Sequence, residues 1–241
     1  MGTVSAAAGG IVRLTETSGS PPAASKVLVA NSVVSTGGKI DLTNNKLITT
    51  SAVGSASGGV YSGVSGLIQT GRGSGTWNGS TGIVTSQTLA SSGNLTSIGV
   101  ATASEAKGIS FSSTATAVWS GQTVTGTDTL VMYTYGGDAN LDGKINVDDY
   151  GRIDFAVPLG IAGWSNGDFN YDGKINVDDY GIIDFNVGIQ GPAFPTSLSQ
   201  LAGSAGSLAA VPEPASLLSL GLASTSLIMG SFRRRRVSRR G

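Results

Sequence analysis

The amino-acid sequence predicts a mixed fold in three parts: a β-rich, sandwich-like N-terminal segment, a small all-α module, and a C-terminal transmembrane helix. Three observations lead to this expectation. β-Branched runs bounded by Gly, Ser and Asn fill residues 26–135. A 21-residue segment at 137–157 recurs at 167–187 with 17 identical positions. An apolar run at 215–232 is just long enough to cross a bilayer and precedes a cluster of arginines.

The charges of the chain are unevenly distributed. The 15 acidic and 15 basic residues balance, yet ten acids lie between Asp138 and Asp184, and six bases follow Phe232. Residues 1–214 therefore carry a net charge of −6, which argues against nucleic acid as their partner. The chain has no His and no Cys, which excludes Ser-His-Asp triads, thiolate chemistry and His-ligated transition metals.

Strand-like patterns dominate residues 25–135, which we expect to form one β-rich domain. The runs at 26–34 and 129–135 are the clearest strands. Alternation at Ile40 and Leu42, followed by the pair Asn44 and Asn45, predicts a hairpin. Residues 60–72 alone show apolar residues at helical spacing, so we expect one helix there.

The same segment offers few groups for catalysis. Its carboxylates between residues 26 and 135 are Asp41, Glu105 and Asp128, whereas a glycosidase needs two matched carboxylates that flank the scissile bond. We therefore expect no enzymatic activity and name no catalytic residue. The alternative is a C-terminal accessory fragment of a polysaccharide-degrading enzyme, a glycoside hydrolase whose catalytic domain lies upstream.

The first 24 residues indicate a linker or a truncated upstream region. They lack the basic and apolar regions of a secretory signal, although the other end of the chain indicates export. We expect the chain to be the C-terminal piece of a longer precursor. A complete protein exported by another route is the alternative.

The duplicated segment has the spacing of two twelve-residue EF-hand calcium loops. Oxygen donors occupy positions 1, 3, 5, 9 and 12, glycine at position 6 permits the sharp turn, and position 7 needs to supply only its backbone carbonyl. Hard oxygen donors in this number favour Ca²⁺ over Mg²⁺, so we expect two bound Ca²⁺ ions. A pair of acidic turns that cap helices is the alternative. The expected ligands are Asp138, Asn140, Asp142, Lys144, Asn146 and Asp149 in the first loop, and Asp168, Asn170, Asp172, Lys174, Asn176 and Asp179 in the second.

Each loop leads into a short helix with apolar residues at helical spacing. The acidic residues next to the predicted helix N-termini, Asp148 and Asp178, fit the macrodipole rather than the ligand set. Further along, Asp154 and Asp184 are expected on solvated faces.

With both repeats in view, residues 137–187 resemble the dockerin type I family. The resemblance implies a compact, pseudo-twofold module at 136–190 with two calcium ions. Cohesin-binding members often carry a Ser-Thr-like pair at loop positions 10 and 11, where this chain has Val147-Asp148 and Val177-Asp178. We therefore do not expect a cohesin partner. So small a module without cysteine would depend on its metal for stability.

The end of the chain has three consecutive parts after a linker at 191–210. Val211, Pro212, Glu213 and Pro214 form a short motif, an apolar run follows, and arginines at 233–236, 239 and 240 come last. The arginines would remain cytoplasmic and leave the body outside. This tail at 211–241 resembles the PEP-CTERM sorting signal, which implies recognition by an exosortase in the inner membrane and removal of the tail.

Taken together, these patterns predict a non-catalytic calcium-binding protein of the cell surface or the extracellular matrix. Its expected partners are an exosortase-type processing enzyme and either a matrix polysaccharide or a surface protein, after transient anchoring in the inner membrane. A permanently anchored protein whose tail is never cut is the alternative.

Overall fold

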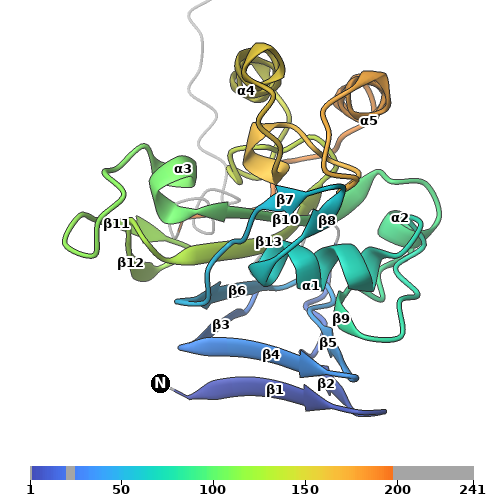
Figure 1. The fold of residues 1–241 in the computed structure, drawn as a ribbon, viewed down its shortest axis with the longest axis vertical. Helices are drawn as coiled ribbons and strands as arrows, with labels where there is room; N and C mark the ends of the chain where they lie inside the picture. Colours follow the sequence, from blue (N-terminus) through green and yellow to red (C-terminus); the bar gives the residue numbers. More distant parts are fainter. Residues whose placement is uncertain (1, 20–24, 198–241) are drawn as a thin grey trace, which may run out of the picture. The chain divides into compact units, whose positions relative to one another are not determined.

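The first six strands pair in parallel in the computed structural model, which describes residues 2–19 and 25–197. The strands are β1 (Thr3–Ala7), β2 (Ile11–Arg13), β3 (Val27–Ala30), β4 (Ser32–Thr36), β5 (Lys39–Asp41) and β6 (Lys46–Thr49). β1 pairs with β4, β2 with β5, and β3 with β6. Two successive turns of the chain therefore stack on one another, as in a β-helix, and Figure 1 shows these strands layered in blue. A third parallel strand, β9 (Gly82–Val84), continues the β2–β5 sheet.

The central sheet joins this stack to the rest of the chain. Its four strands run in the order β10-β13-β6-β3, where β10 (Thr96–Thr102) and β13 (Thr129–Tyr135) are antiparallel neighbours. Every residue of β13 is buried, as its continuous apolar and β-branched sequence indicates. The sheet thus forms the middle of the hydrophobic core.

Smaller elements surround the central sheet. Two hairpins are formed by β7 (Ala56–Ser57) with β8 (Val60–Tyr61), and by β11 (Thr116–Trp119) with β12 (Gln122–Thr125). The helix expected at 60–72 is present as α1 (Gly63–Arg72), and two short helices follow, α2 (Thr88–Ser91) and α3 (Ala103–Lys107).

The N-terminal segment is β-rich as predicted, but the sandwich-like arrangement is wrong. The chain stacks parallel strands instead of facing two antiparallel sheets against each other. The prediction of a hairpin at Asn44 and Asn45 is wrong as well, because the strands on either side of this pair, β5 and β6, belong to different sheets. Thr43 makes the turn with φ of 51°, while both asparagine side chains are buried and bond to the loop that contains Thr17.

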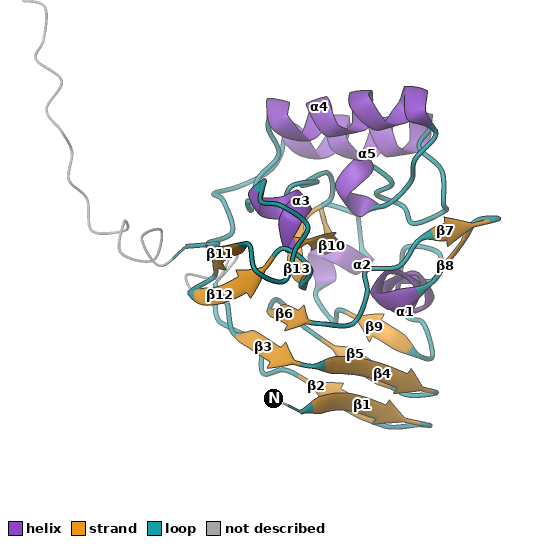
Figure 2. Ribbon diagram, turned by 60° about the vertical axis from the view of Figure 1, so that its left-hand side comes forward, coloured by secondary structure: helices purple, strands orange, loops and turns teal. Residues whose placement is uncertain are grey.

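The duplicated segment forms two loop–helix units that contain α4 (Val147–Ala156) and α5 (Val177–Val187). Two short 3₁₀ helices, η1 (Val157–Leu159) and η2 (Trp164–Asn166), lie between them. Figure 2 shows α4 and α5 side by side, away from β1 and β2.

The expectation of a separate, small all-α dockerin-like module of two EF-hand-type repeats is wrong. Residues Met1–Ser204 form one compact unit, and a single core holds apolar residues from the sheet and from both loops. The Tyr171 hydroxyl of the second loop donates to the Ile98 carbonyl of β10 at 2.7 Å. A Cβ on Gly99 would lie 2.5 Å from Trp164 Nε1, so the indole packs directly on β10. The loops are part of the β-rich core because their own apolar residues are buried in it.

In the part of the chain that the structure describes, no helix has the length and apolar character needed to cross a bilayer. The transmembrane helix expected at 215–232 falls outside the described residues, as does the motif Val211–Pro214.

Candidate functional site

The first loop runs from Asp138, after the end of β13, to Asp149 in the first turn of α4. Asp138 accepts the N–H of Asp142 on Oδ1 at 3.1 Å and the N–H of Gly143 on Oδ2 at 3.0 Å. The carboxylate of Asp149 accepts the N–H groups of Ala139, at 2.8 Å, and Asn146, at 2.8 Å. The carboxylates at positions 1 and 12 are thereby held by the loop's own backbone.

The second loop repeats this geometry closely. Asp168 accepts the N–H of Asp172 on Oδ1 at 3.1 Å and the N–H of Gly173 on Oδ2 at 2.8 Å. Asp179 accepts the N–H of Phe169 at 2.9 Å and the N–H of Asn176 at 3.0 Å. The sequence identity of the two segments therefore corresponds to the same hydrogen-bond pattern, in which the aspartates at positions 1 and 12 accept the loop's backbone N–H groups.

The residues at position 9 start the helices. Asn146 and Asn176 are the N-caps of α4 and α5, and each accepts the N–H two residues later at 2.7 Å. Each cap forms a capping box with the position-12 aspartate. The side chains of Lys144 and Lys174 are exposed, so these residues could contribute only a backbone carbonyl to a metal site. Asn140 and Asn170 donate their side-chain N–H groups to the position-5 aspartates at 3.4 Å.

The residues at position 4 were missed by sequence reasoning. Leu141 and Tyr171 adopt left-handed backbone conformations, with φ of 57° and 60°, and bury their side chains in the core. Tyr171 stacks on Trp164 with ring centroids 5.5 Å apart. The available signal was that these large apolar side chains stand between polar donors, where a free-standing loop would expose them.

Each position-6 glycine is covered by a distant segment. Phe194 donates its N–H to the Gly143 carbonyl at 2.8 Å, and a Cβ on Gly143 would lie 2.0 Å from the Phe194 carbonyl oxygen. In the second loop, a Cβ on Gly173 would lie 2.8 Å from the Cα of Gly59, in the β7–β8 turn. The glycines therefore allow both the positive φ of the loop and the close approach of a second backbone.

The loops bury negative charge. Asp138, Asp149, Asp168 and Asp179 are each 0% exposed. Burial, reinforced by Asp149, raises the pKa of Asp138 well above its usual value, and burial raises the pKa of Asp149 and Asp179 to about 6. The ion pair between Arg13 and Asp41 is the one found among the described residues, so none of these four carboxylates has a cationic side chain within ion-pair distance. The buried guanidinium of Arg72 interacts electrostatically with Asp168 and Asp179 of the second loop without forming an ion pair with either.

Buried carboxylates are normally paired with a cation or a metal, so this charge pattern and the oxygen donors fit a hard cation such as Ca²⁺. Carboxylates alone do not form such a site. In the part of the chain that the structure describes, no group of three or more His, Cys, Asp or Glu side chains is placed to hold a metal ion. A calcium ion at either loop would therefore also need the amide and backbone carbonyl oxygens.

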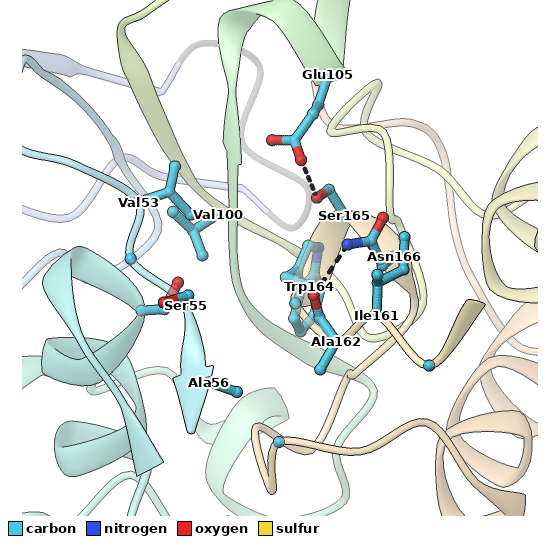
Figure 3. Close-up of a pocket in the computed structure, with 15 residues that line it drawn as sticks. Val53, Ser55, Ala56, Val100, Glu105, Ile161, Ala162, Trp164, Ser165 and Asn166 are labelled. Atoms are coloured by element: carbon cyan, nitrogen blue, oxygen red, sulfur yellow. Dashed lines mark hydrogen bonds between the residues drawn. The ribbon is translucent and has the colours of Figure 1, made fainter. Parts of the chain in front are cut away.

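A cavity of about 420 Å³ lies between the β7 segment, β10 and the residues around η2. Figure 3 shows Glu105 at its edge, where Oε1 accepts a hydrogen bond from Ser165 Oγ at 2.9 Å. The other oxygen, Oε2, accepts the N–H of Thr102 at 2.7 Å as part of the α3 capping box. Glu105 is the sole titratable side chain among the described residues that line the cavity, so the cavity offers no matched pair of carboxylates.

The other two carboxylates considered for catalysis, Asp41 and Asp128, accept backbone N–H groups in turns. Asp41 is buried, pairs with Arg13 Nε at 2.7 Å and accepts the N–H of Thr43 at 2.9 Å. Asp128 accepts the N–H of Thr125 at 2.7 Å. Neither lines the cavity that contains Glu105.

Comparison with known proteins bears on the end of the chain. A family model described as the PEP-CTERM protein-sorting motif matches residues 210–236. Neither the curated proteins nor the solved structures contain a match to this chain, and no comparison supports the resemblance of residues 137–187 to dockerins. PEP-CTERM signals are processed by exosortase. The chain therefore carries a PEP-CTERM sorting signal, which directs it toward the cell surface or the extracellular space with an exosortase as its processing partner.

Proposed function

We propose that this chain is a non-catalytic, calcium-stabilised protein of the cell surface or extracellular matrix. The observation that carries the proposal is the burial of Asp138, Asp149, Asp168 and Asp179 in two loops of matching geometry, with no cationic side chain of the described residues within ion-pair distance of them. Folding such loops without a cation brings carboxylates together out of water, which costs free energy. A bound calcium ion would supply the missing positive charge.

The ligand set follows from the loop positions. In the first loop, Asp138, Asn140, Asp142 and Asp149 would bind through side-chain oxygens, and Lys144 through its carbonyl. The second loop would use the residues thirty positions later. Asn146 and Asn176 cap helices with their side-chain oxygens, which leaves position 9 to act through a water molecule.

The location that the sorting signal implies fits a modest calcium affinity. Extracellular calcium modules bind with Kd values of about 10⁻⁴ to 10⁻³ M. Here the closing residue at position 12 is Asp rather than Glu, so its carboxylate reaches the loop with a shorter side chain. We place both sites in this weaker range.

Exposed apolar side chains on the two helices support a protein partner. Val147 and Val177 are 78% and 79% exposed, and Phe155 and Phe185 are 67% and 64% exposed. Exposed apolar clusters rimmed by polar residues commonly mark interaction sites. We therefore favour a surface protein over a matrix polysaccharide as the ligand of this face, with the tail holding the chain in the inner membrane until an exosortase cuts it.

Isothermal titration calorimetry of the full chain with CaCl₂ tests the calcium sites. The wild type is expected to bind two ions, and Asp142→Ala and Asp172→Ala are each expected to remove one. Asp148→Ala and Asp178→Ala are matched controls, because these exposed carboxylates lie in the first helical turns and outside the ligand set. Absence of binding at millimolar calcium would reduce both loops to acidic turns that cap helices.

The mass of the mature surface protein tests removal of the tail. Cleavage near Pro214 would yield a species that lacks the arginines at 233–240. A surface species that retains Arg240 would instead support permanent anchoring.

A further inference from the structure

The first aspartate of each loop accepts a hydrogen bond from a hydroxyl outside the twelve-residue loop. In the first loop the donor is Thr134 of β13, which bonds to Asp138 Oδ2. In the second loop the donor is Tyr61 of β8, whose hydroxyl lies 2.5 Å from Asp168 Oδ2 and comes from a residue 107 positions earlier. The two loops therefore use equivalent hydrogen bonds from unrelated parts of the chain.

Tyr61 is held firmly in this position. It is 6% exposed, and its ring meets Tyr171 edge-on with centroids 5.9 Å apart. Its backbone N–H donates to Gln69 Oε1 at 2.9 Å, and Gln69 Nε2 donates to the carbonyls of Gly59 at 2.8 Å and Tyr171 at 2.7 Å. Gln69 therefore connects α1 and the β7–β8 turn to the second loop.

We propose that Tyr61 is a positioning residue for the second calcium site, an inference that rests on the proposed calcium-binding function. Asp168 Oδ2 accepts hydrogen bonds from Tyr61 and from the N–H of Gly173, which fix the orientation of the carboxylate. Outer hydrogen-bond partners of this kind orient metal ligands, and their loss typically weakens metal binding about 10- to 100-fold.

The role assigned to Tyr61 goes beyond packing. Tyr61→Phe keeps the aromatic ring against Tyr171 and removes only the hydroxyl, so a packing role predicts little change in calcium affinity. A positioning role predicts a selective loss at the second site, because the carboxylate of Asp168 gains freedom to rotate. The first site, which depends on Thr134, should keep its affinity.

Two glycine amides can report the two sites separately. Gly143 N–H donates to Asp138 and Gly173 N–H donates to Asp168, so each backbone resonance follows its own loop. We would titrate the ¹⁵N-labelled full chain with CaCl₂, in a mild detergent because of the apolar run at 215–232. Tyr133→Phe is the matched control, since Tyr133 is 3% exposed and its hydroxyl bonds to Thr96 rather than to a residue of either loop.

In Tyr61→Phe, the calcium midpoint at Gly173 is expected to rise at least about tenfold while the midpoint at Gly143 stays constant. Thr134→Val is expected to give the reciprocal result, and Tyr133→Phe to change neither midpoint. A Gly173 midpoint within twofold of wild type in folded Tyr61→Phe would overturn the inference and leave the calcium sites intact. A wild-type chain that shows no calcium response at either glycine would overturn the proposed function, and the inference with it.

If Tyr61→Phe fails to fold, the resonances of both glycines would lose their native positions. Tyr61→Trp would then replace it, because tryptophan keeps an aromatic ring and supplies an N–H donor. Partial recovery of the Gly173 midpoint relative to Tyr61→Leu, which has no donor, would support positioning. Equal midpoints in these two variants would overturn it.

Discussion

The Tyr150 hydroxyl donates a hydrogen bond to Asp184 Oδ1 over 2.7 Å and so joins α4 to α5. Tyr180 makes the equivalent bond to Asp154 Oδ1 at 2.6 Å, which shows that the helices run antiparallel with pseudo-twofold symmetry. Asp154 and Asp184 are exposed, as expected, and each also accepts one of these cross-helix hydrogen bonds. Because the sequence is duplicated, each helix supplies one hydrogen-bond donor, a tyrosine, and one acceptor, an aspartate, to the other helix.

Loss of these cross-helix bonds should destabilise the chain modestly. We expect Tyr150→Phe and Tyr180→Phe each to lower the free energy of unfolding by about 0.5–1 kcal/mol, at the low end for exposed groups. Urea unfolding in excess calcium measures the change. A double-mutant cycle of Tyr150→Phe with Asp184→Ala isolates the pair, and a coupling energy near zero would contradict this contribution.

Lys46 gives the unfolding free energy a dependence on pH. This side chain is 2% exposed and donates to the Pro195 carbonyl at 2.7 Å, and burial lowers its pKa to about 8. Between pH 8 and the unfolded pKa near 10.5, the unfolded state binds more protons than the folded state. Stability should therefore rise with pH in this window, because the cost of burying a charged ammonium disappears.

The expected gain between pH 8 and pH 10 is on the order of 2 kcal/mol. Urea unfolding at a series of pH values measures it, and Lys46→Met is the comparison because it keeps the unbranched side chain without the charge. The rise should be absent in Lys46→Met. Parallel pH profiles for the two proteins would show that Lys46 is not the group responsible.

Local spacing predicted much of the candidate site. The positions of the acidic loops and of α4, α5 and α1 follow from donor spacing and apolar periodicity, which depend on neighbouring residues. The parallel pairing of β1 with β4 could not be read from the sequence, because short strands carry the same alternation in either direction. The contact of Tyr61 with Asp168 joins residues 107 positions apart, and no local pattern records it.

The separate module was a wrong prediction for a related reason. Donor spacing describes the loop and says nothing about its surroundings. Leu141 and Tyr171 were among the positions that could have indicated a shared core, since both are large side chains between the polar donors of the loops. In the structure they are 1% and 2% exposed.

Two glycines of the first repeat should respond to substitution in opposite directions. Gly151 lies within α4 and a Cβ there meets no atom within 4 Å, so Gly151→Ala should raise the unfolding free energy by about 0.5–1 kcal/mol. Gly143 has φ of 97° and no room beside Phe194. Gly143→Ala should therefore destabilise the chain by more than about 2 kcal/mol. Thermal unfolding compares both with wild type, and a neutral Gly143→Ala would contradict the close approach of Phe194.

Calcium should stabilise the whole β-rich unit rather than the two helices alone. Leu141 and Tyr171 connect the loops to the core of the sheet, and Trp119 Nε1 donates to the Leu141 carbonyl at 3.5 Å. Two independent sites at a hundred times their Kd would add about 5 kcal/mol, or a rise in Tm of roughly 10–20 °C for a unit of this size.

Thermal unfolding in EGTA and in excess calcium measures the shift with two probes. Helical circular dichroism follows α4 and α5 together with α1 and the two short helices, and tryptophan fluorescence follows the core through Trp119 and Trp164, which are both 1% exposed. Because the loops and the sheet share one core, both probes should move together and give a single transition in each condition. An early loss of helix in EGTA with unchanged tryptophan melting would show that the sheet folds independently of the loops.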